Sequence, residues 1–132
     1  MKRHIPDAVG MAALAADIVA RLTFPAVVYL RGDLGAGKTT LAREILSALG
    51  HQGAVKSPTY SLYESYAMRS LTAHHLDLYR LTDPEELDNI GFRDLLGADL
   101  LLIEWPERGG ERLPAPTLTV QCAYADAGRD II

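Results

Sequence analysis

The sequence predicts an α/β fold in three layers, with helices on both faces of a mixed, mostly parallel central sheet. An apolar run at Ala26–Leu30 leads into the glycine-rich segment Gly32–Thr39, and a helical pattern follows it at Thr40–Leu49. A second apolar run, Leu100–Ile103, ends at Glu104. Because continuous apolar runs are typical of strands buried on both faces, we expect the two runs to be parallel neighbours that bind ligands at their carboxyl ends.

The elements expected before residue 80 are two helices and three strands. In chain order we expect a helix at Asp7–Leu22, a strand at Ala26–Arg31, a helix at Thr40–Leu49, and strands at Tyr60–Tyr66 and Leu71–Asp77. Apolar residues at helical spacing predict the first helix, with Asp7 as its N-cap. The last two strands form a hairpin around residues 68–70.

Shorter elements follow. Asp83-Pro84-Glu85-Glu86 combines an N-cap, a proline at the first helical position and acidic residues in the first turn. This helix should run to about Asn89, before Gly91. The remaining elements are a helical turn at Phe92–Leu96, a strand at Leu100–Glu104, a turn-rich segment at Gly109–Pro116, and closing strands at Thr117–Ala123 and Arg129–Ile132.

Composition indicates one globular domain over residues 1–132. The chain is 48% hydrophobic and 23% charged, an ordinary balance for a soluble domain. No apolar run is long enough to cross a bilayer, and the start of the chain lacks a signal-peptide core. The single cysteine, Cys122, excludes an internal disulfide and fits a small buried side chain. We therefore expect a cytoplasmic protein.

The net charge of −4 limits the direct partners. The chain has 13 basic and 17 acidic residues and no cluster of lysine and arginine. A protein that grips nucleic acid by itself usually has a basic face. Any role on RNA would therefore act through a partner protein.

The segment Gly32–Thr39 has the spacing of a phosphate-binding loop, or P-loop, in its strand–loop–helix context. Glycines allow the backbone amides to surround phosphate oxygens, and the following helix adds its positive end. Lys38 reaches the β- and γ-phosphates, and the Thr39 hydroxyl binds Mg²⁺. The residues expected to hold a nucleoside triphosphate in this segment are Gly35, Ala36, Gly37, Lys38, Thr39 and Thr40.

Two strand-end carboxylates are candidates for the chemistry. Glu104 follows a buried apolar strand, where the second protein group at Mg²⁺ is expected, although a solvated strand-end glutamate would look the same. Asp77 ends another strand, and its alternative is a local cap or a salt bridge with Arg80.

Other polar and aromatic residues flank these carboxylates. Thr59 follows Pro58 in a loop that either senses the γ-phosphate or satisfies its own turn. Trp105, the only tryptophan, either lies at the nucleotide or covers the edge of the core. His74 and His75 face opposite sides of one strand and lack metal-ligand spacing, so we interpret both as structural.

Five blocks of the sequence resemble the TsaE (YjeE) family, small bacterial ATPases required for threonylcarbamoyladenosine modification of tRNA. They are Gly32–Thr40, Ser57–Leu62, His75–Leu81, Gly91-Phe92 and Ile103–Arg108. The resemblance implies a P-loop NTPase-like domain that hydrolyses ATP to ADP and phosphate, slowly when alone. It also implies partner proteins, TsaB and TsaD, which modify the adenosine next to the anticodon, so that tRNA is reached only indirectly.

The resemblance assigns roles to individual residues. It implies that Thr39 and Glu104 hold Mg²⁺, and that Thr59 and Asp77 lie in segments that sense the γ-phosphate. It implies that Trp105 is needed for activity, that Glu107 lies near the nucleotide, and that Arg129 approaches ATP. The catalytic set is Lys38, Asp77 and Glu104.

Three functions are compatible with these patterns. The leading one is a Mg²⁺-dependent ATPase in which Asp77 orients water, directly or through metal-bound solvent. In the second, ATP and ADP set the affinity for a protein partner and turnover is incidental. The third, a small-molecule kinase, is disfavoured because the sequence has no arginine-rich lid.

Overall fold

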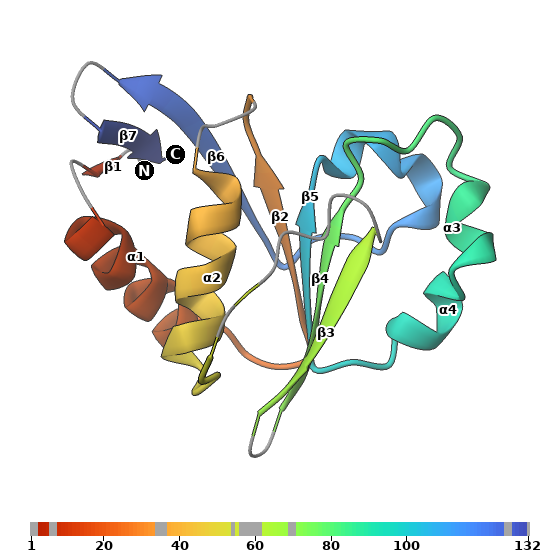
Figure 1. Ribbon diagram of the computed structural model, residues 1–132, viewed down its shortest axis with the longest axis horizontal. Coiled ribbons are helices and arrows are strands. Elements are labelled where there is room, and N and C mark those ends of the chain that lie inside the picture. Colours follow the sequence, from red (N-terminus) through yellow and green to blue (C-terminus); the bar gives the residue numbers. More distant parts are fainter. Residues whose placement is uncertain are drawn as a thin grey trace.

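The computed structural model describes residues 3–5, 8–33, 37–53, 55, 62–68, 71–125 and 128–131. In this part of the chain seven strands form one sheet in the order β1-β7-β6-β2-β5-β4-β3 (Figure 1). They are β1 (Arg3–Ile5), β2 (Ala26–Arg31), β3 (Tyr63–Ala67), β4 (Thr72–Asp77), β5 (Leu100–Glu104), β6 (Leu118–Ala125) and β7 (Gly128–Ile131).

The centre of the sheet is parallel and its edges are antiparallel. Strand β2 pairs in parallel with both β5 and β6, and β4 pairs in parallel with β5. Strands β3, β7 and β1 are each antiparallel to their neighbours β4, β6 and β7. The predicted mixed sheet is confirmed, and β2 and β5 are the expected parallel neighbours.

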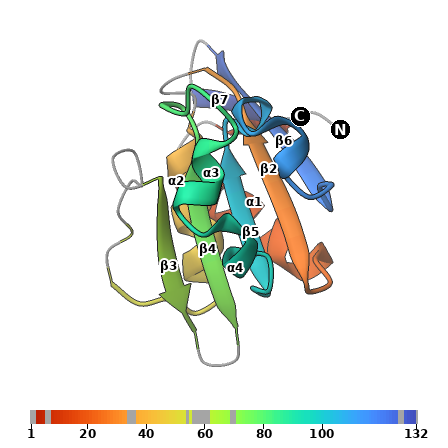
Figure 2. The ribbon, with the colours of Figure 1, turned by 90° about the vertical axis from the view of Figure 1, so that its right-hand side faces the viewer.

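Helices cover both faces of the sheet. They are α1 (Ala8–Arg21), α2 (Lys38–Ala48), α3 (Glu86–Asn89) and α4 (Phe92–Leu95), with 3₁₀ turns η1 (Pro106–Arg108) and η2 (Gly110–Arg112). Helices α1 and α2 lie together on one face, and α3 and α4 lie on the other (Figures 1 and 2). The three-layer arrangement is therefore confirmed.

Strand β5 explains why three layers are stable. Leu100 and Leu102 belong to the apolar core under α1 and α2. Leu101 and Ile103 belong to a second core with Leu87 and other side chains of α3 and α4. Because successive side chains of a strand point to opposite faces, an unbroken apolar run fills both cores.

The strand register brings the C-terminal ends of β2, β4 and β5 together at one edge of the sheet. Glu104 pairs with Leu30 at the end of β2 and with Asp77 at the end of β4. The P-loop leaves β2 at this same edge, which lies at the top of Figure 1. The edge therefore brings together Asp77, Glu104 and the start of the P-loop.

Several element boundaries differ from the sequence prediction. Helix α2 begins at Lys38 rather than at Thr40, and β6 continues to Ala125. Helix α3 begins at Glu86 rather than next to Asp83, because i+3 hydrogen bonds first close a turn there. Strand β1 was not predicted. The predicted N-cap Asp7 lies outside the described residues.

The structure bears on two expectations from composition, the burial of the single cysteine and the lack of a membrane-spanning segment. Cys122 is buried, and burial raises the pKa of its thiol to about 11. No helix in the described ranges combines the length and the apolar character needed to cross a membrane.

Candidate active site

A buried carboxylate lies at the centre of the site. Glu104 is 2% exposed at the end of β5. The hydroxyl of Thr39, in the first turn of α2, lies 3.0 Å from each of the two Glu104 oxygens. The Nε2 atom of His75, on β4, lies 2.6 Å from Glu104 Oε2. Donors from two elements therefore hold one carboxylate at the N-terminus of α2.

Lys38 is folded back onto the protein. Its ammonium group donates a hydrogen bond to the carbonyl oxygen of Gly32 and lies 3.7 Å from the centre of the Trp105 ring. The residue is only 4% exposed. Burial lowers the pKa of Lys38, while Glu104 and Asp77 act in the opposite direction. The contact with the indole face is a cation–π interaction.

The backbone of Trp105 directs its ring toward Lys38. Its φ of 58° and ψ of 50° are left-handed, a conformation that few residues other than glycine adopt. The ring is 5.0 Å from that of Tyr79, and the Arg108 guanidinium lies 5.9 Å from the indole centre. Trp105 therefore lies at the P-loop lysine and also packs against the edge of the second core.

Asp77 lies beside Glu104 in the β4–β5 register and is 7% exposed. Its Oδ1 accepts a hydrogen bond from the Tyr79 amide at 3.0 Å, so the local cap considered from the sequence is present. Burial is the main reason that the pKa of Asp77 is raised, and the nearby Glu104 raises it further. The group is thus a buried acid close to the P-loop lysine.

The remaining predicted residues are placed to different degrees. Gly37 precedes α2 with a φ of 103°, and Thr40 lies half-buried in the first turn of that helix. Glu107, on η1, is exposed and close enough to raise the pKa of Lys38. Gly35, Ala36 and Thr59 lie outside the described residues.

Arg129 is placed only by its backbone. It pairs with Tyr124 of β6 and with Ile5 of β1. Strand β7 is separated from β2 by β6, and the β6–β7 pairing lies beyond the carboxyl end of β2. Its predicted approach to ATP stays a prediction.

The start of the P-loop is fixed against β6. Gly32 has a φ of 141°, and a Cβ atom there would overlap the carbonyl oxygen of Cys122. Only glycine permits this close approach of two backbones. The carbonyl group of Gly32 is in turn the acceptor for Lys38.

The donor set at Thr39 and Glu104 fits Mg²⁺. Both residues offer oxygen atoms, which hard cations prefer, and Mg²⁺ in nucleotide sites takes only one or two protein ligands. Within the described ranges, no group of three or more His, Cys, Asp and Glu residues could hold a metal ion. Thr39 and Glu104 would hold such a cation together with oxygens from phosphate or water.

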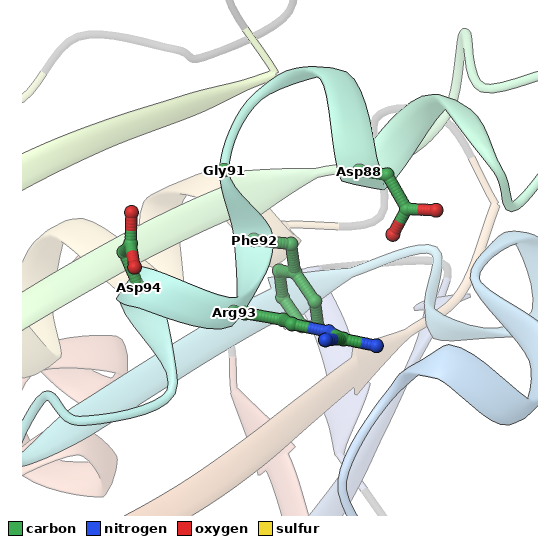
Figure 3. Close-up of a pocket in the computed structure, with 5 residues that line it drawn as sticks. All are labelled: Asp88, Gly91, Phe92, Arg93 and Asp94. Atoms are coloured by element: carbon green, nitrogen blue, oxygen red, sulfur yellow. The ribbon is translucent and has the colours of Figure 1, made fainter.

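A separate pocket lies where α3 meets α4. Its volume is about 330 Å³, and it is lined by Asp88, Gly91, Phe92, Arg93 and Asp94 (Figure 3). Gly91 turns the chain between the two helices with a φ of 70°. The pocket lies on the face opposite α2, and none of the predicted site residues lines it.

Comparison with known proteins identifies the family. The model of the family described as threonylcarbamoyl adenosine biosynthesis protein TsaE matches residues 5–131. The chain belongs to the TsaE family. The resemblance found in the sequence blocks is therefore confirmed, and it places the chain among proteins of threonylcarbamoyladenosine biosynthesis in tRNA.

Individual TsaE relatives and a solved structure agree with this assignment. The protein named tRNA threonylcarbamoyladenosine biosynthesis protein TsaE from Haemophilus influenzae is 47% identical, over 99% of this chain and 87% of the relative. The TsaE protein of Rickettsia conorii is 42% identical over 76% of this chain and 58% of its own length. The crystal structure of Bacillus subtilis YdiB superposes with a TM-score of 0.77 at 28% identity, covering 99% of this chain and 82% of YdiB.

One residue in this TsaE-family site was not predicted. His75 was interpreted as structural, yet the structure places it against Glu104. His74, on the other face of β4, instead contacts Ser65 at 2.7 Å. The available signal was the i, i+2 spacing of His75 and Asp77, which puts both on the same face of one strand.

Proposed function

We propose that this chain is a Mg²⁺-dependent ATPase that acts in threonylcarbamoyladenosine modification of tRNA, at the adenosine next to the anticodon. The observation that carries the proposal is the convergence of the Thr39 hydroxyl and the Glu104 carboxylate beside Lys38 at the N-terminus of α2. Membership of the TsaE family supplies the biological process.

Thr39 and Glu104 are the residues that would hold Mg²⁺. Their oxygens already lie 3.0 Å apart, so a small cation needs only a modest rearrangement of two side chains. With ATP, a Mg²⁺ ion held by Thr39 and Glu104 would neutralise phosphate charge. The buried position of Glu104 keeps bulk water from competing for its oxygens.

Lys38 supplies positive charge to the phosphates. In the structure its ammonium group rests on Gly32 and Trp105, next to the start of the P-loop. Phosphate oxygens are stronger acceptors for an ammonium than a carbonyl or an aromatic face. ATP therefore draws Lys38 from its resting contacts. The positive charge of Lys38 then stabilises the transition state of phosphoryl transfer to water.

Asp77 is assigned to orienting the attacking water. It lies next to Glu104 in the strand register and influences the pKa of Lys38. Its Oδ1 is engaged by the Tyr79 amide, which fixes the orientation of the carboxyl group. A carboxylate fixed in this way accepts a hydrogen bond from water and sets its direction of attack.

The protein partners proposed are TsaB and TsaD, with tRNA bound through them. The net charge of −4 and the lack of a lysine and arginine cluster in the sequence make the chain a poor ligand for RNA by itself. An ATPase without its own RNA-binding face requires partners that bring the modified base to the complex.

The test compares Glu104→Gln with Glu111→Gln, a substitution of an exposed carboxylate on η2. Phosphate release and threonylcarbamoyladenosine formation are measured with TsaB, TsaD and tRNA. We expect Glu104→Gln to bind ATP in EDTA like the wild type but to lose about 10²–10³-fold in hydrolysis. It should also lose tRNA modification, whereas Glu111→Gln should match the wild type.

Two results would replace the proposal. Normal tRNA modification by Glu104→Gln without hydrolysis would favour the nucleotide-gated binding module. Recovery of the γ-phosphate on a small molecule, rather than as free phosphate, would favour the kinase.

A further inference from the structure

His75 occupies a position where a polar side chain is costly. It is fully buried on β4, opposite Leu102 of β5 and on the sheet face covered by α1 and α2. Burial of a polar group is unfavourable unless a hydrogen bond compensates for it. A histidine kept here needs a reason beyond filling volume, since leucine would fill a similar volume without that cost.

The compensation comes from Glu104. The Nε2 atom of His75 lies 2.6 Å from Glu104 Oε2, while its other nitrogen, Nδ1, has no partner among the described residues. With the ring proton assigned to Nε2, His75 donates this hydrogen bond and the Glu104 carboxylate accepts it. The polar contacts found for the ring are therefore directed entirely at Glu104.

Glu104 then has two donors of different kinds. The Thr39 hydroxyl lies 3.0 Å from each carboxylate oxygen but has a single hydrogen to donate. The His75 donor comes from the neighbouring strand β4 and contacts Oε2 alone. When the Thr39 oxygen turns to a cation, the hydrogen bond from His75 still fixes the carboxylate.

We infer that His75 is a positioning residue for Glu104: its Nε2–H holds Oε2, so that Oε1 stays directed at the Thr39 oxygen and at a cation shared by the two. The inference rests on the proposed function, because it needs a divalent cation at Thr39 and Glu104. Donors that orient metal-binding side chains from behind typically contribute 10–100-fold to metal affinity.

The experiment measures Mn²⁺ binding by electron paramagnetic resonance, with the protein saturated with ADP. Three variants are compared with the wild type. His75→Leu removes the donor and keeps an apolar volume, and His75→Gln retains an N–H at about the same reach. His74→Gln changes the neighbouring histidine on the other face, which contacts Ser65 instead.

We expect His75→Leu to weaken Mn²⁺ binding about 10–100-fold while its ADP affinity in EDTA is unchanged. His75→Gln should stay within about threefold of the wild type, as should His74→Gln. A merely structural histidine would instead lower thermal stability without affecting the metal. If His75→Leu does not fold, His75→Asn, whose amide is too short to reach Glu104, should show the same loss.

The inference is overturned if His75→Leu, or His75→Asn in its place, binds Mn²⁺ as the wild type does. Equal weakening by His75→Leu and His75→Gln would also overturn it, because the N–H would then be irrelevant. A wild type that binds no Mn²⁺ with ADP would remove the proposed function and the inference together. That failure is recognisable because it appears before any substitution.

Discussion

Burial determines the chemistry of individual residues at this site. Lys38, Asp77, Glu104 and His75 are each at most 7% exposed, although buried polar and charged groups are unfavourable without partners. Glu104 has donors on two sides, and Lys38 rests on a carbonyl group and an aromatic face. Asp77 is the exception, because its surroundings on balance favour the neutral acid. The role proposed for Asp77 in catalysis therefore carries a cost in stability that can be measured.

Asp77→Asn is expected to stabilise the nucleotide-free protein at pH 7. Because the folded-state pKa of Asp77 is raised, the native state binds more protons than the unfolded chain between the two pKa values. The stability contributed by this group is fully present below the unfolded pKa and is lost as pH rises through the folded one. At pH 7 each unit of the raised pKa costs about 1.4 kcal/mol.

Urea unfolding of Asp77→Asn and the wild type, at pH 7 and near pH 4, measures this effect. Asparagine keeps an oxygen for the Tyr79 amide, so the local cap survives the substitution. The gain should shrink toward pH 4, near the unfolded pKa of about 3.9. A variant less stable than the wild type at pH 7 would contradict the expected cost.

Substitutions of Thr39 distinguish a role in binding the metal from a role in stabilising the fold. Thr39→Ala should raise the Mg²⁺ concentration for half-maximal ATP hydrolysis by about 10–100-fold, because an oxygen next to Glu104 is lost. Thr39→Ser keeps the hydroxyl and should stay within about threefold. The measurement is the initial rate against Mg²⁺ at saturating ATP. Unchanged turnover in Thr39→Ala would remove this residue from the metal site.

Trp105 should report the movement of Lys38. It is the only tryptophan, and the lysine ammonium lies 3.7 Å from its ring centre. Under the proposed function, ATP draws that charge to its phosphates, so the emission of the indole should change on titration. Without nucleotide, Lys38→Met should already differ from the wild type, because the cation is absent from the ring. A flat titration of the wild type at saturating ATP would argue against the movement.

At the scale of elements, the sequence predicted the helices and strands that local residue patterns determine. It missed those that form only through contacts with distant parts of the chain. Strands β2 and β5 match their predicted bounds because an unbroken apolar run can only be buried between two layers. Strand β1 was missed because Arg-His-Ile has no strand pattern of its own and forms only by pairing with the distant β7. The start of α3 was misplaced since its capping residues close a turn first.

The same division holds for the site. Lys38, Thr39 and Glu104 follow from one loop motif and one strand end, so the sequence predicted their proximity. The contact of His75 with Glu104 depends on the register of β4 against β5, which no local pattern encodes. The left-handed Trp105 also depends on tertiary packing, since its sequence carries no glycine at that turn.

The close contact between the start of the P-loop and β6 predicts that a side chain at Gly32 disturbs the loop. Gly32→Ala would bring a Cβ into the Cys122 carbonyl oxygen, and Gly50→Ala is a matched control. Gly50 also has a positive φ, 107°, but has nothing within 4 Å of a Cβ. We expect Gly50→Ala to cost about 1–2 kcal/mol of stability and to leave ATP affinity unchanged.

Gly32→Ala should cost more than Gly50→Ala and also weaken ATP binding. A displaced Gly32 moves both the start of the P-loop and the carbonyl group that holds Lys38. Thermal unfolding and ATP titration of the two variants measure the two effects separately. Equal losses of stability with wild-type ATP affinity would show that the approach to Cys122 does not fix the loop.

At the scale of the whole molecule, the charge of the chain bears on whether the proposed ATPase could contact tRNA by itself. The chain carries 17 acidic and 13 basic residues. Affinity for nucleic acid comes largely from cations that neutralise phosphates. The cation next to Glu104, Lys38, is buried and committed to its own contacts. Under the proposed function, ATP hydrolysis would therefore affect tRNA through a protein that contacts both.

This indirect route predicts how tRNA binding is divided within the complex. Alone, the chain should bind tRNA more weakly than about 10⁻⁴ M at physiological salt, the weak end of non-specific binding by basic proteins. With TsaB and TsaD present it should join the tRNA complex, and its retention should differ between ATP and ADP, because each nucleotide couples to partner affinity. Fluorescence anisotropy of labelled tRNA, with a pull-down under each nucleotide, measures both. Micromolar binding of tRNA by the chain alone would contradict the indirect route and would require a basic surface that its sequence does not suggest.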